Sequence, residues 1–240
     1  MAIVNDHTVK AFDEELNRLR GLIGEMGGRA EQALLQAMTA LGSGDRELAA
    51  RVVEGDKAID ALEAEVEQLA VQTIALRAPM ADDLREMIAA LKIVSVVERI
   101  GDYAKNIAKR VALMDQTRSI EAIPVLMSMS SLVAELVHDA LDSFAARDAR
   151  LAVRVTVRDR NVDDFYNSIF RMLVTFMMEN PKHITESAHL LFVAKNLERI
   201  GDHATNIAEM VHYVVTGERM EERERGATPE SGAATAREPD

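Results

Sequence analysis

The stretch ERIGDYAKNIA at residues 98–108 returns as ERIGDHATNIA at residues 198–208, with nine of the eleven positions identical. A second pair of similar segments precedes it in the same order. DRELAARVVEGDKAID begins at Asp45, and DARLAVRVTVRDRNVD begins at Asp148. Repetition of two segments in one order indicates an internal duplication. The chain therefore consists of two related halves, which join near residues 115–124.

Each half has the pattern of three long helices. Apolar residues recur at steps of three and four, as in Leu16, Leu19 and Ile23, which places them on one helix face. Breaks fall at residues 42–45, where Asp45 is suited to cap the next helix, and before Pro79 and Pro181. No segment shows the convincing two-residue alternation of a strand.

These signals predict helices over residues 8–41, 45–76, 82–115, 120–146, 148–178 and 183–216. The predicted fold class is all-α, with two tandem three-helix bundles related by internal duplication. The first bundle is expected to occupy residues 1–116 and the second residues 117–216. Residues 217–240 are dense in charge and poor in apolar side chains, so we predict a disordered tail.

Composition excludes several classes of function. The 240 residues carry 28 Lys and Arg against 40 Asp and Glu, a net charge of −12, and contain no cysteine. An acidic chain without an evident basic face is not expected to bind nucleic acid. The absence of cysteine excludes disulfide scaffolds, zinc fingers, iron–sulfur clusters and cysteine nucleophiles.

The sequence also lacks the usual targeting signals. Its first residues do not combine a basic region with an apolar one, as a secretory signal would. The most apolar run, residues 169–178, is too short to span a bilayer. We therefore expect a cytoplasmic protein without direct membrane insertion.

The duplicated motif carries pairs of carboxylates. Residues four apart on a helix lie on one face, one turn apart, and each motif extends its pair with an asparagine. This row lies opposite the apolar stripe of its own helix. The preceding helix of each half carries another pair at the same spacing, so antiparallel packing would bring four carboxylates together in each half. The pairs are Glu98 with Asp102, Glu198 with Asp202, Asp56 with Asp60, and Asp159 with Asp163.

Like charges at this spacing repel, so something is expected to compensate them. A bound cation is one explanation, because oxygen ligands without thiolates suit Mg²⁺, Mn²⁺, Ca²⁺ or iron. Neighbouring cations, Arg99, Arg199 or Lys105, are another, and a solvated acidic face with salt bridges is a third. Gly101 and Gly201 lie within the motif, where a glycine destabilises a helix by about 1 kcal/mol relative to an alanine. They indicate either close helix approach or room for an ion or partner.

The two ERIGD motifs, with VVEGDKAID at residues 52–60 upstream, closely resemble the PhoU family of phosphate-transport regulators over residues 8–216. The resemblance implies two tandem three-helix bundles, frequent dimerisation, and metal binding through E/DxxxD motifs on the bundle surface. The expected metals are iron, manganese, magnesium or zinc. On that likeness the candidate metal ligands are Asp56, Asp60, Glu98, Asp102, Asp159, Asp163, Glu198 and Asp202.

The same resemblance implies a regulatory role without enzymatic activity. Such proteins act between the phosphate-specific ABC transporter, through its ATPase subunit, and a membrane sensor histidine kinase. They restrain phosphate uptake and the starvation response when phosphate is plentiful. The expected partners are these two proteins and a second copy of the chain. The sequence shows no Gly-rich phosphate loop, which agrees with a protein that reports transporter state.

Three alternatives remain open. Di-iron carboxylate enzymes use Glu-x-x-His motifs, and this chain contains Glu135 with His138 and Glu186 with His189. These pairs lie off the apolar stripe or far from the ERIGD row, so we interpret them as chance. The second alternative is a metal-free helical scaffold whose acids meet basic residues of a partner. The third is a structural repeat without any link to phosphate.

Overall fold

The computed structural model describes residues 2–114 and 122–220, with side chains from Phe12 onward. The described residues form six long α-helices, one short 3₁₀ turn and no strand. The elements are α1 (Ala2–Ser43), α2 (Arg46–Arg77), α3 (Asp82–Val111), α4 (Ala122–Ala146), α5 (Ala149–Glu179), η1 (Pro181–His183) and α6 (Ile184–Thr216).

Equivalent caps begin the second helix of each half. The Asp45 carboxylate accepts hydrogen bonds from the backbone N–H groups of Glu47 and Leu48, at 3.0 and 2.9 Å. Asp148 caps α5 in the same way, at 2.8 and 3.0 Å. A side-chain oxygen at this position satisfies N–H groups that have no partner inside the helix. The predicted cap at Asp45 is confirmed, and the duplication extends to the cap.

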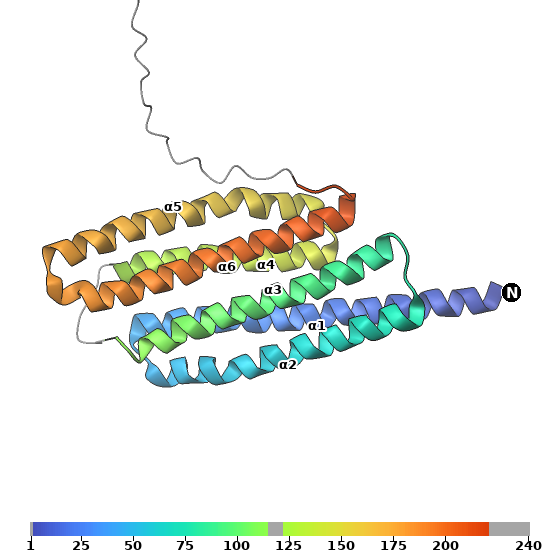
Figure 1. Ribbon diagram of the computed structural model, residues 1–240, viewed down its shortest axis with the longest axis horizontal. Helices are drawn as coiled ribbons and strands as arrows, with labels where there is room; N and C mark the ends of the chain where they lie inside the picture. The colour runs from blue at the N-terminus through green and yellow to red at the C-terminus, as the bar shows by residue number, and fades with distance from the viewer. Residues whose placement is uncertain (1, 115–121, 221–240) are drawn as a thin grey trace, which may run out of the picture.

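The helices form two bundles that share one core. α1, α2 and α3 pack on one another, as do α4, α5 and α6. The bundles meet where α3 packs against α6 and α1 against α4. In Figure 1, α3 and α6 lie in front of α1 and α4, while α2 and α5 flank them on opposite sides. The molecule thus has one face formed by α3 and α6 and another formed by α1 and α4.

Burial of apolar stripes stabilises this arrangement. Ile93, Val97 and Ile100 of α3 and Leu197 and Ile200 of α6 are fully buried in one continuous hydrophobic cluster. Each such side chain contributes on the order of 1.5–3 kcal/mol by leaving water. Because the stripes of α3 and α6 belong to one cluster, the position of each motif is fixed by packing in both bundles.

A buried acid links the two bundles as well. Glu86 of α3 is 1% exposed and pairs with Arg20 of α1. Arg147, in the connection between α4 and α5, lies 2.9 Å from the second Glu86 oxygen. Removal of one partner from a buried pair is strongly destabilising. This cluster therefore holds α1 and α3 of the first bundle against the connection between α4 and α5 of the second bundle.

The predicted fold class is confirmed, and the predicted helix bounds agree closely with those observed. α1 begins earlier than predicted, at Ala2, and α3 ends earlier, at Val111. Most of the junction between the halves, residues 115–121, and the tail from residue 221 lie outside the described residues. The predicted disorder of the tail and the predicted domain boundaries stay predictions.

The helix nearest to a membrane span is α4, and not the run at residues 169–178. By length and composition α4 is apolar enough to cross a bilayer. Its residues Leu126, Met129 and Val133 are fully buried in the protein core. A core helix of a bundle passes the same test of composition, so burial explains the apolar character of α4.

Candidate functional site

The two copies of the repeated motif lie next to each other where α3 and α6 meet. The rings of Tyr103 and His203, which occupy equivalent positions in the two copies, stack with centroids 5.5 Å apart and planes 20° apart. The Arg199 guanidinium lies 5.8 Å from the centroid of the Tyr103 ring. α3 and α6 run antiparallel in Figure 1, so the duplicated halves face each other across a local pseudo-two-fold axis.

His203 lies in an environment that disfavours the charged form of its ring. Burial lowers its pKa, and the positive charges of Arg99 and Arg199 lower it further. Its Nε2 atom is buried without a hydrogen-bond partner among the described residues. Both conditions disfavour the protonated ring.

The first acidic cluster lies between α2 and α3. Asp56 is 6% exposed and accepts a hydrogen bond from Lys105 of α3. The same ammonium group lies 2.5 Å from Asp102, one turn earlier on α3. Burial lowers the pKa of Lys105, but the hydrogen bonds to Asp102 and Asp56 outweigh it and raise the pKa. Lys105 thus compensates two of the predicted ligands, as one alternative from the sequence anticipated.

Glu98 belongs to the same cluster but has no such cation. Burial, the charges of Asp102, Glu63 and Asp60, and a hydrogen bond to Asp102 together raise the pKa of Glu98 to about 7. A carboxyl that donates to a neighbouring carboxylate must carry a proton. Glu98 therefore keeps its proton to a higher pH than an ordinary glutamate does.

Glu63 is a member of this cluster that the sequence analysis missed. Burial raises its pKa, as do the charges of Glu67, Asp60 and Asp102. Glu63 lies three residues after Asp60, which places both on one face of α2. The three-residue spacing could have identified Glu63, but the candidate ligands were chosen as pairs of acids four residues apart.

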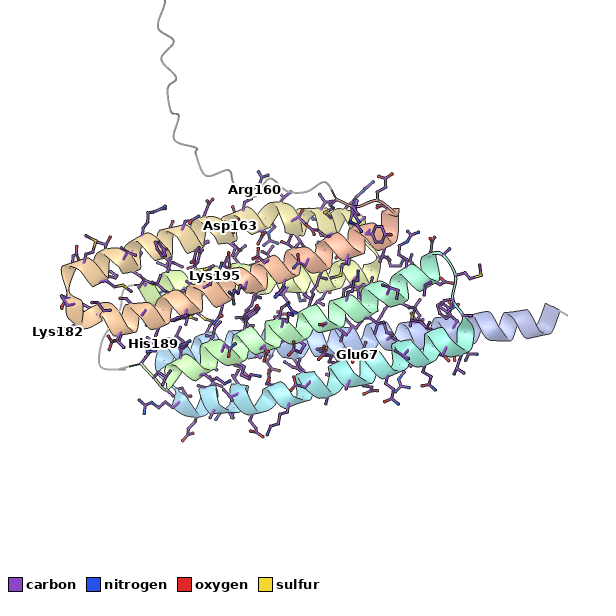
Figure 2. All side chains as sticks on the ribbon, viewed as in Figure 1. Glu67, Arg160, Asp163, Lys182, His189 and Lys195 are labelled. Atoms are coloured by element: carbon purple, nitrogen blue, oxygen red, sulfur yellow. The ribbon has the colours of Figure 1, made fainter. Side chains whose placement is uncertain are left out.

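The second cluster, between α5 and α6, has a different counter-charge. Asp159 is 2% exposed, whereas Asp163 lies on the exposed side of α5. Lys195 lies 2.6 Å from Glu198, an ionic contact without regular hydrogen-bond geometry. Figure 2 shows Asp163 and Lys195 on neighbouring stretches of α5 and α6. Asp202 follows Glu198 by one turn and is half-buried.

The difference between the clusters follows from three substitutions between the halves, the first of which places Lys195 where the first half has Ser95. The position of Lys105 is taken by Thr205 in the second half, and that of Glu63 by Tyr166. The Lys195 ammonium group lies 5.3 Å from the centroid of the Tyr166 ring. In the first half the cation, Lys105, follows the acid pair of the motif along the chain. In the second half the cation, Lys195, precedes it.

The glycines of the motif allow close helix packing. A Cβ atom at Gly101 would lie 2.8 Å from Ile59 Cδ1, and one at Gly201 would lie 3.0 Å from Asp159 Oδ1 and 3.2 Å from Val162 Cγ1. Real Cβ atoms essentially never approach as closely as the first of these. Of the two explanations left open by the sequence, the geometry favours close approach of α2 to α3 and of α5 to α6.

The donor types of both clusters suit hard cations, because carboxylate oxygens are the ligands that Mg²⁺ and Mn²⁺ prefer. Among the described residues, however, no three His, Asp or Glu side chains are already placed to hold one ion. The clusters supply the right atoms, and a bound ion would draw them closer. The metal ligands stay a prediction.

The two Glu-x-x-His pairs do not converge in the described part of the chain. Glu135 pairs with Arg158, and His138 contacts Glu31 of α1 at 3.3 Å. His189 contacts Arg110 at 3.4 Å. Their side chains have separate partners, which agrees with their interpretation as chance.

Comparisons with known proteins identify the repeat. A family model described as the PhoU domain matches residues 23–111 and again residues 126–211. These two matches fall on α1 to α3 and on α4 to α6. The duplicated unit of the sequence is therefore the unit of the family model.

Relatives resemble the chain over nearly its whole length. The "phosphate-specific transport system accessory protein PhoU homolog" of Zymomonas mobilis is 56% identical over 220 residues, covering 92% of this chain and 93% of the relative. The protein of the same name from Caulobacter vibrioides is 46% identical over 218 residues, covering 90% and 95%. The crystal structure of PhoU from Pseudomonas aeruginosa is similar with a TM-score of 0.83 and 39% identity, over 86% of this chain and all of that one.

Proposed function

This chain belongs to the PhoU family, and from that membership we propose that it is a cytoplasmic accessory protein of a phosphate-specific transport system, with a regulatory and not an enzymatic role. The observation that carries the proposal is the coverage of its relatives. Similarity to proteins named as accessory proteins of this system extends over about nine-tenths of both chains. The similarity includes both bundles and both acidic clusters.

In its finer form, we propose that the protein is an adaptor. It connects the ATPase subunit of the phosphate ABC transporter with a membrane sensor histidine kinase, and it acts as a homodimer. When phosphate is plentiful it restrains uptake and keeps the starvation response off. A helical scaffold with two faces can present separate surfaces to two partners, which supports this role.

The test is removal of the gene from its host. The expected result is uncontrolled phosphate uptake and constitutive expression of starvation genes in high phosphate, both restored by the wild-type gene. Pull-down of the tagged chain in high and low phosphate, with mass spectrometry, is expected to recover the ATPase subunit or the kinase in a phosphate-dependent way. Unchanged uptake and gene expression after deletion would contradict the proposal and favour a purely structural repeat.

We further propose that the acidic clusters bind divalent metal ions through their oxygen atoms. The candidate ligands remain Asp56, Asp60, Glu98, Asp102, Asp159, Asp163, Glu198 and Asp202. A metal ion would remove the repulsion that raises the pKa of Glu98. One observation favours a metal-free scaffold instead: Lys105 already compensates Asp56 and Asp102 in the first cluster.

A fourfold variant separates these two possibilities. It replaces both ERIGD acid pairs: Glu98→Gln, Asp102→Asn, Glu198→Gln and Asp202→Asn. Metal binding predicts loss of bound Mn²⁺ or iron with an intact fold. The matched control neutralises four exposed acids elsewhere, Asp13, Glu14, Glu47 and Glu209, and is expected to keep the metal. If wild-type protein purified without chelator never contains or binds metal, the scaffold interpretation holds.

A further inference from the structure

A groove with an apolar floor and a basic rim lies between the start of α3 and the end of α6. Its volume is about 420 Å³. Leu84, Ile88 and Tyr213 line its floor and are 37%, 43% and 40% exposed. Clustered exposed apolar side chains mark binding surfaces more often than scattered ones do. Three cations also line the groove, and they are Arg85, Lys92 and Arg219. None of the described lining residues is acidic.

The cations of this groove are available to a partner. Lys92 and Arg219 form no ion pair with any described residue, and Arg85 pairs only with the exposed Asp82. The Arg85 guanidinium also lies 5.5 Å from the centroid of the Tyr213 ring, which holds it over the groove floor. Two cations without an ion pair among the described residues, Lys92 and Arg219, are notable in a chain whose net charge is −12.

The basic character continues along the line where α3 and α6 meet. Arg99 and Arg199 flank the Tyr103 and His203 stack, and neither forms an ion pair with a described residue. At the far end, the Arg110 guanidinium lies 4.5 Å from the centroid of the Phe192 ring. We call this line, with the groove at its end, the basic seam. The line where α3 and α6 meet runs along the front face of the molecule in Figure 1.

The basic seam is bordered by acids. Asp102 lies three residues from Arg99 on α3, and Asp202 lies three residues from Arg199 on α6, so each motif places a cation on the seam and an acid beside it. A flat anionic membrane would bring both acidic clusters against its headgroups. A single helix, about 10 Å in diameter, can contact the seam without covering the clusters.

We propose that the basic seam binds an amphipathic helix of a partner protein, whose apolar side chains enter the groove and whose carboxylates meet Arg85, Lys92 and Arg219. A cleft between two helices that offers apolar anchor sites is a common receptor for such a helix. The charge complementarity steers the encounter and fixes the orientation. The inference rests on the proposed function in one respect, because it assigns a surface to one of the protein partners of the adaptor.

The experiment places a photo-crosslinking amino acid at Ile88 in the full-length chain in its host, and maps the linked peptide by mass spectrometry. The chain offers a matched control at Leu35, which has the same 43% exposure and lies in a groove on the opposite face. That groove is lined by acids, including Glu31, Glu135 and Asp139. We expect Ile88, and not Leu35, to link to an acidic amphipathic helical segment of another protein.

A binding measurement then tests the role of charge. The linked segment is made as a labelled peptide and titrated with the full-length chain. The double variant Arg85→Glu, Lys92→Glu is expected to weaken binding at least tenfold. The control variant Arg51→Glu, Arg154→Glu changes net charge equally at exposed positions of α2 and α5 and is expected to stay within threefold of wild type.

Several results would overturn the inference. They are crosslinks from Ile88 to lipid, to a second copy of this chain or to a basic segment, no crosslink at all, and equal loss of binding in the two double variants. The proposed function is judged separately by deletion of the gene. An acidic helix from a protein unrelated to phosphate, with an unchanged starvation response, would keep the seam and reject the function. A changed starvation response after deletion, together with one of the contradicting crosslinking or binding results, would keep the function and reject the seam.

Discussion

Glu98 is the residue whose replacement tests the acidic cluster most directly. Burial and its acidic neighbours raise the pKa of Glu98 from 4.5 to about 7. In the metal-free protein above this pH, Glu98 carries a charge that the folded state disfavours. The substitution Glu98→Gln removes that charge and keeps an N–H donor for Asp102. We therefore expect the variant to be more stable than the wild type in alkaline solution.

The sign and size follow from proton linkage. Between pH 4.5 and 7 the folded state holds the Glu98 proton more tightly than the unfolded state does, so the free energy of unfolding falls as the pH rises. At 1.36 kcal/mol for each pH unit, the upper limit is about 3.4 kcal/mol. Because Glu98 is partly exposed, solvent screening reduces this to roughly 1–2 kcal/mol. The gain in the variant is complete above pH 7 and absent below pH 4.5.

The assay is urea denaturation followed by circular dichroism, in chelator, at pH 4.5 and pH 8. Glu98→Gln is expected to match the wild type at pH 4.5 and to exceed it by roughly 1–2 kcal/mol at pH 8. Glu198→Gln is the matched control, because Lys195 lies 2.6 Å from that carboxylate. It is expected to lose up to about 1 kcal/mol at pH 8. A destabilised Glu98→Gln at pH 8 would refute the reasoning and show that the Glu98 charge is compensated.

Three further predictions concern the residues around the motif. Lys105→Met leaves its buried carboxylate partner unpaired and is expected to cost about 2–4 kcal/mol in chemical denaturation, whereas Lys57→Met, in an exposed pair, is expected to leave the stability unchanged. Gly201→Ala displaces a buried carboxylate and is expected to lower stability by about 1–3 kcal/mol. The added Cβ of Gly101→Ala would lie 2.8 Å from Ile59 Cδ1, 3.4 Å from Ile59 Cγ2 and 3.7 Å from Asp56 Oδ1. Because the nearest of these atoms is the end of a side chain, the thermal midpoint of this variant is expected to change less. His203→Phe removes a ring whose pKa is lowered by burial and by the charges of Arg99 and Arg199; the stability of the wild type relative to this variant should fall as the pH drops below 6.5, and equal pH profiles would exclude this.

The sequence was sufficient to predict the architecture because its signals are local and repeated. The predicted cap at Asp45 and the apolar stripes fix the helices, and the duplication fixes their grouping. The spacing of Glu98 and Asp102 also predicted that acids of neighbouring helices would approach one another. That Lys105 bridges Asp56 and Asp102 was only one of several open alternatives, because helical spacing gives the face of a residue but not its partner.

The basic seam could not have been predicted in this way. Its cations come from α3, from α6 and from Arg219 just after α6, about a hundred residues apart in the sequence, and acids are interspersed among them along the chain. Net charge and linear charge patterns therefore hide it. Only the antiparallel pairing of α3 with α6 brings Arg99 beside His203 and Arg199 beside Tyr103. The middle of the seam is a consequence of the duplication, since the same motif supplies one arginine from each half, whereas the groove cations Arg85, Lys92 and Arg219 lie outside the motif.

The seam and the acidic clusters should act on each other through charge. Asp102 lies within one turn of Arg99, and Asp202 within one turn of Arg199, so the clusters weaken the positive potential that an acidic helix would meet. A divalent ion bound to a cluster would remove part of this negative charge and tighten binding of the helix. Coupling between two sites is reciprocal, so the helix would raise the affinity of the cluster for metal by the same factor.

Titration of the acidic peptide at fixed ionic strength, with and without Mn²⁺, measures this factor. We expect about a 3- to 10-fold increase in affinity, corresponding to roughly 0.7–1.4 kcal/mol of coupling. The fourfold variant that neutralises both ERIGD acid pairs should bind the peptide tightly without Mn²⁺ and lose the response to it. A metal response that survives in this variant would place the ion elsewhere. Equal peptide affinity in variant and wild type without metal would show that the clusters and the seam are electrostatically independent.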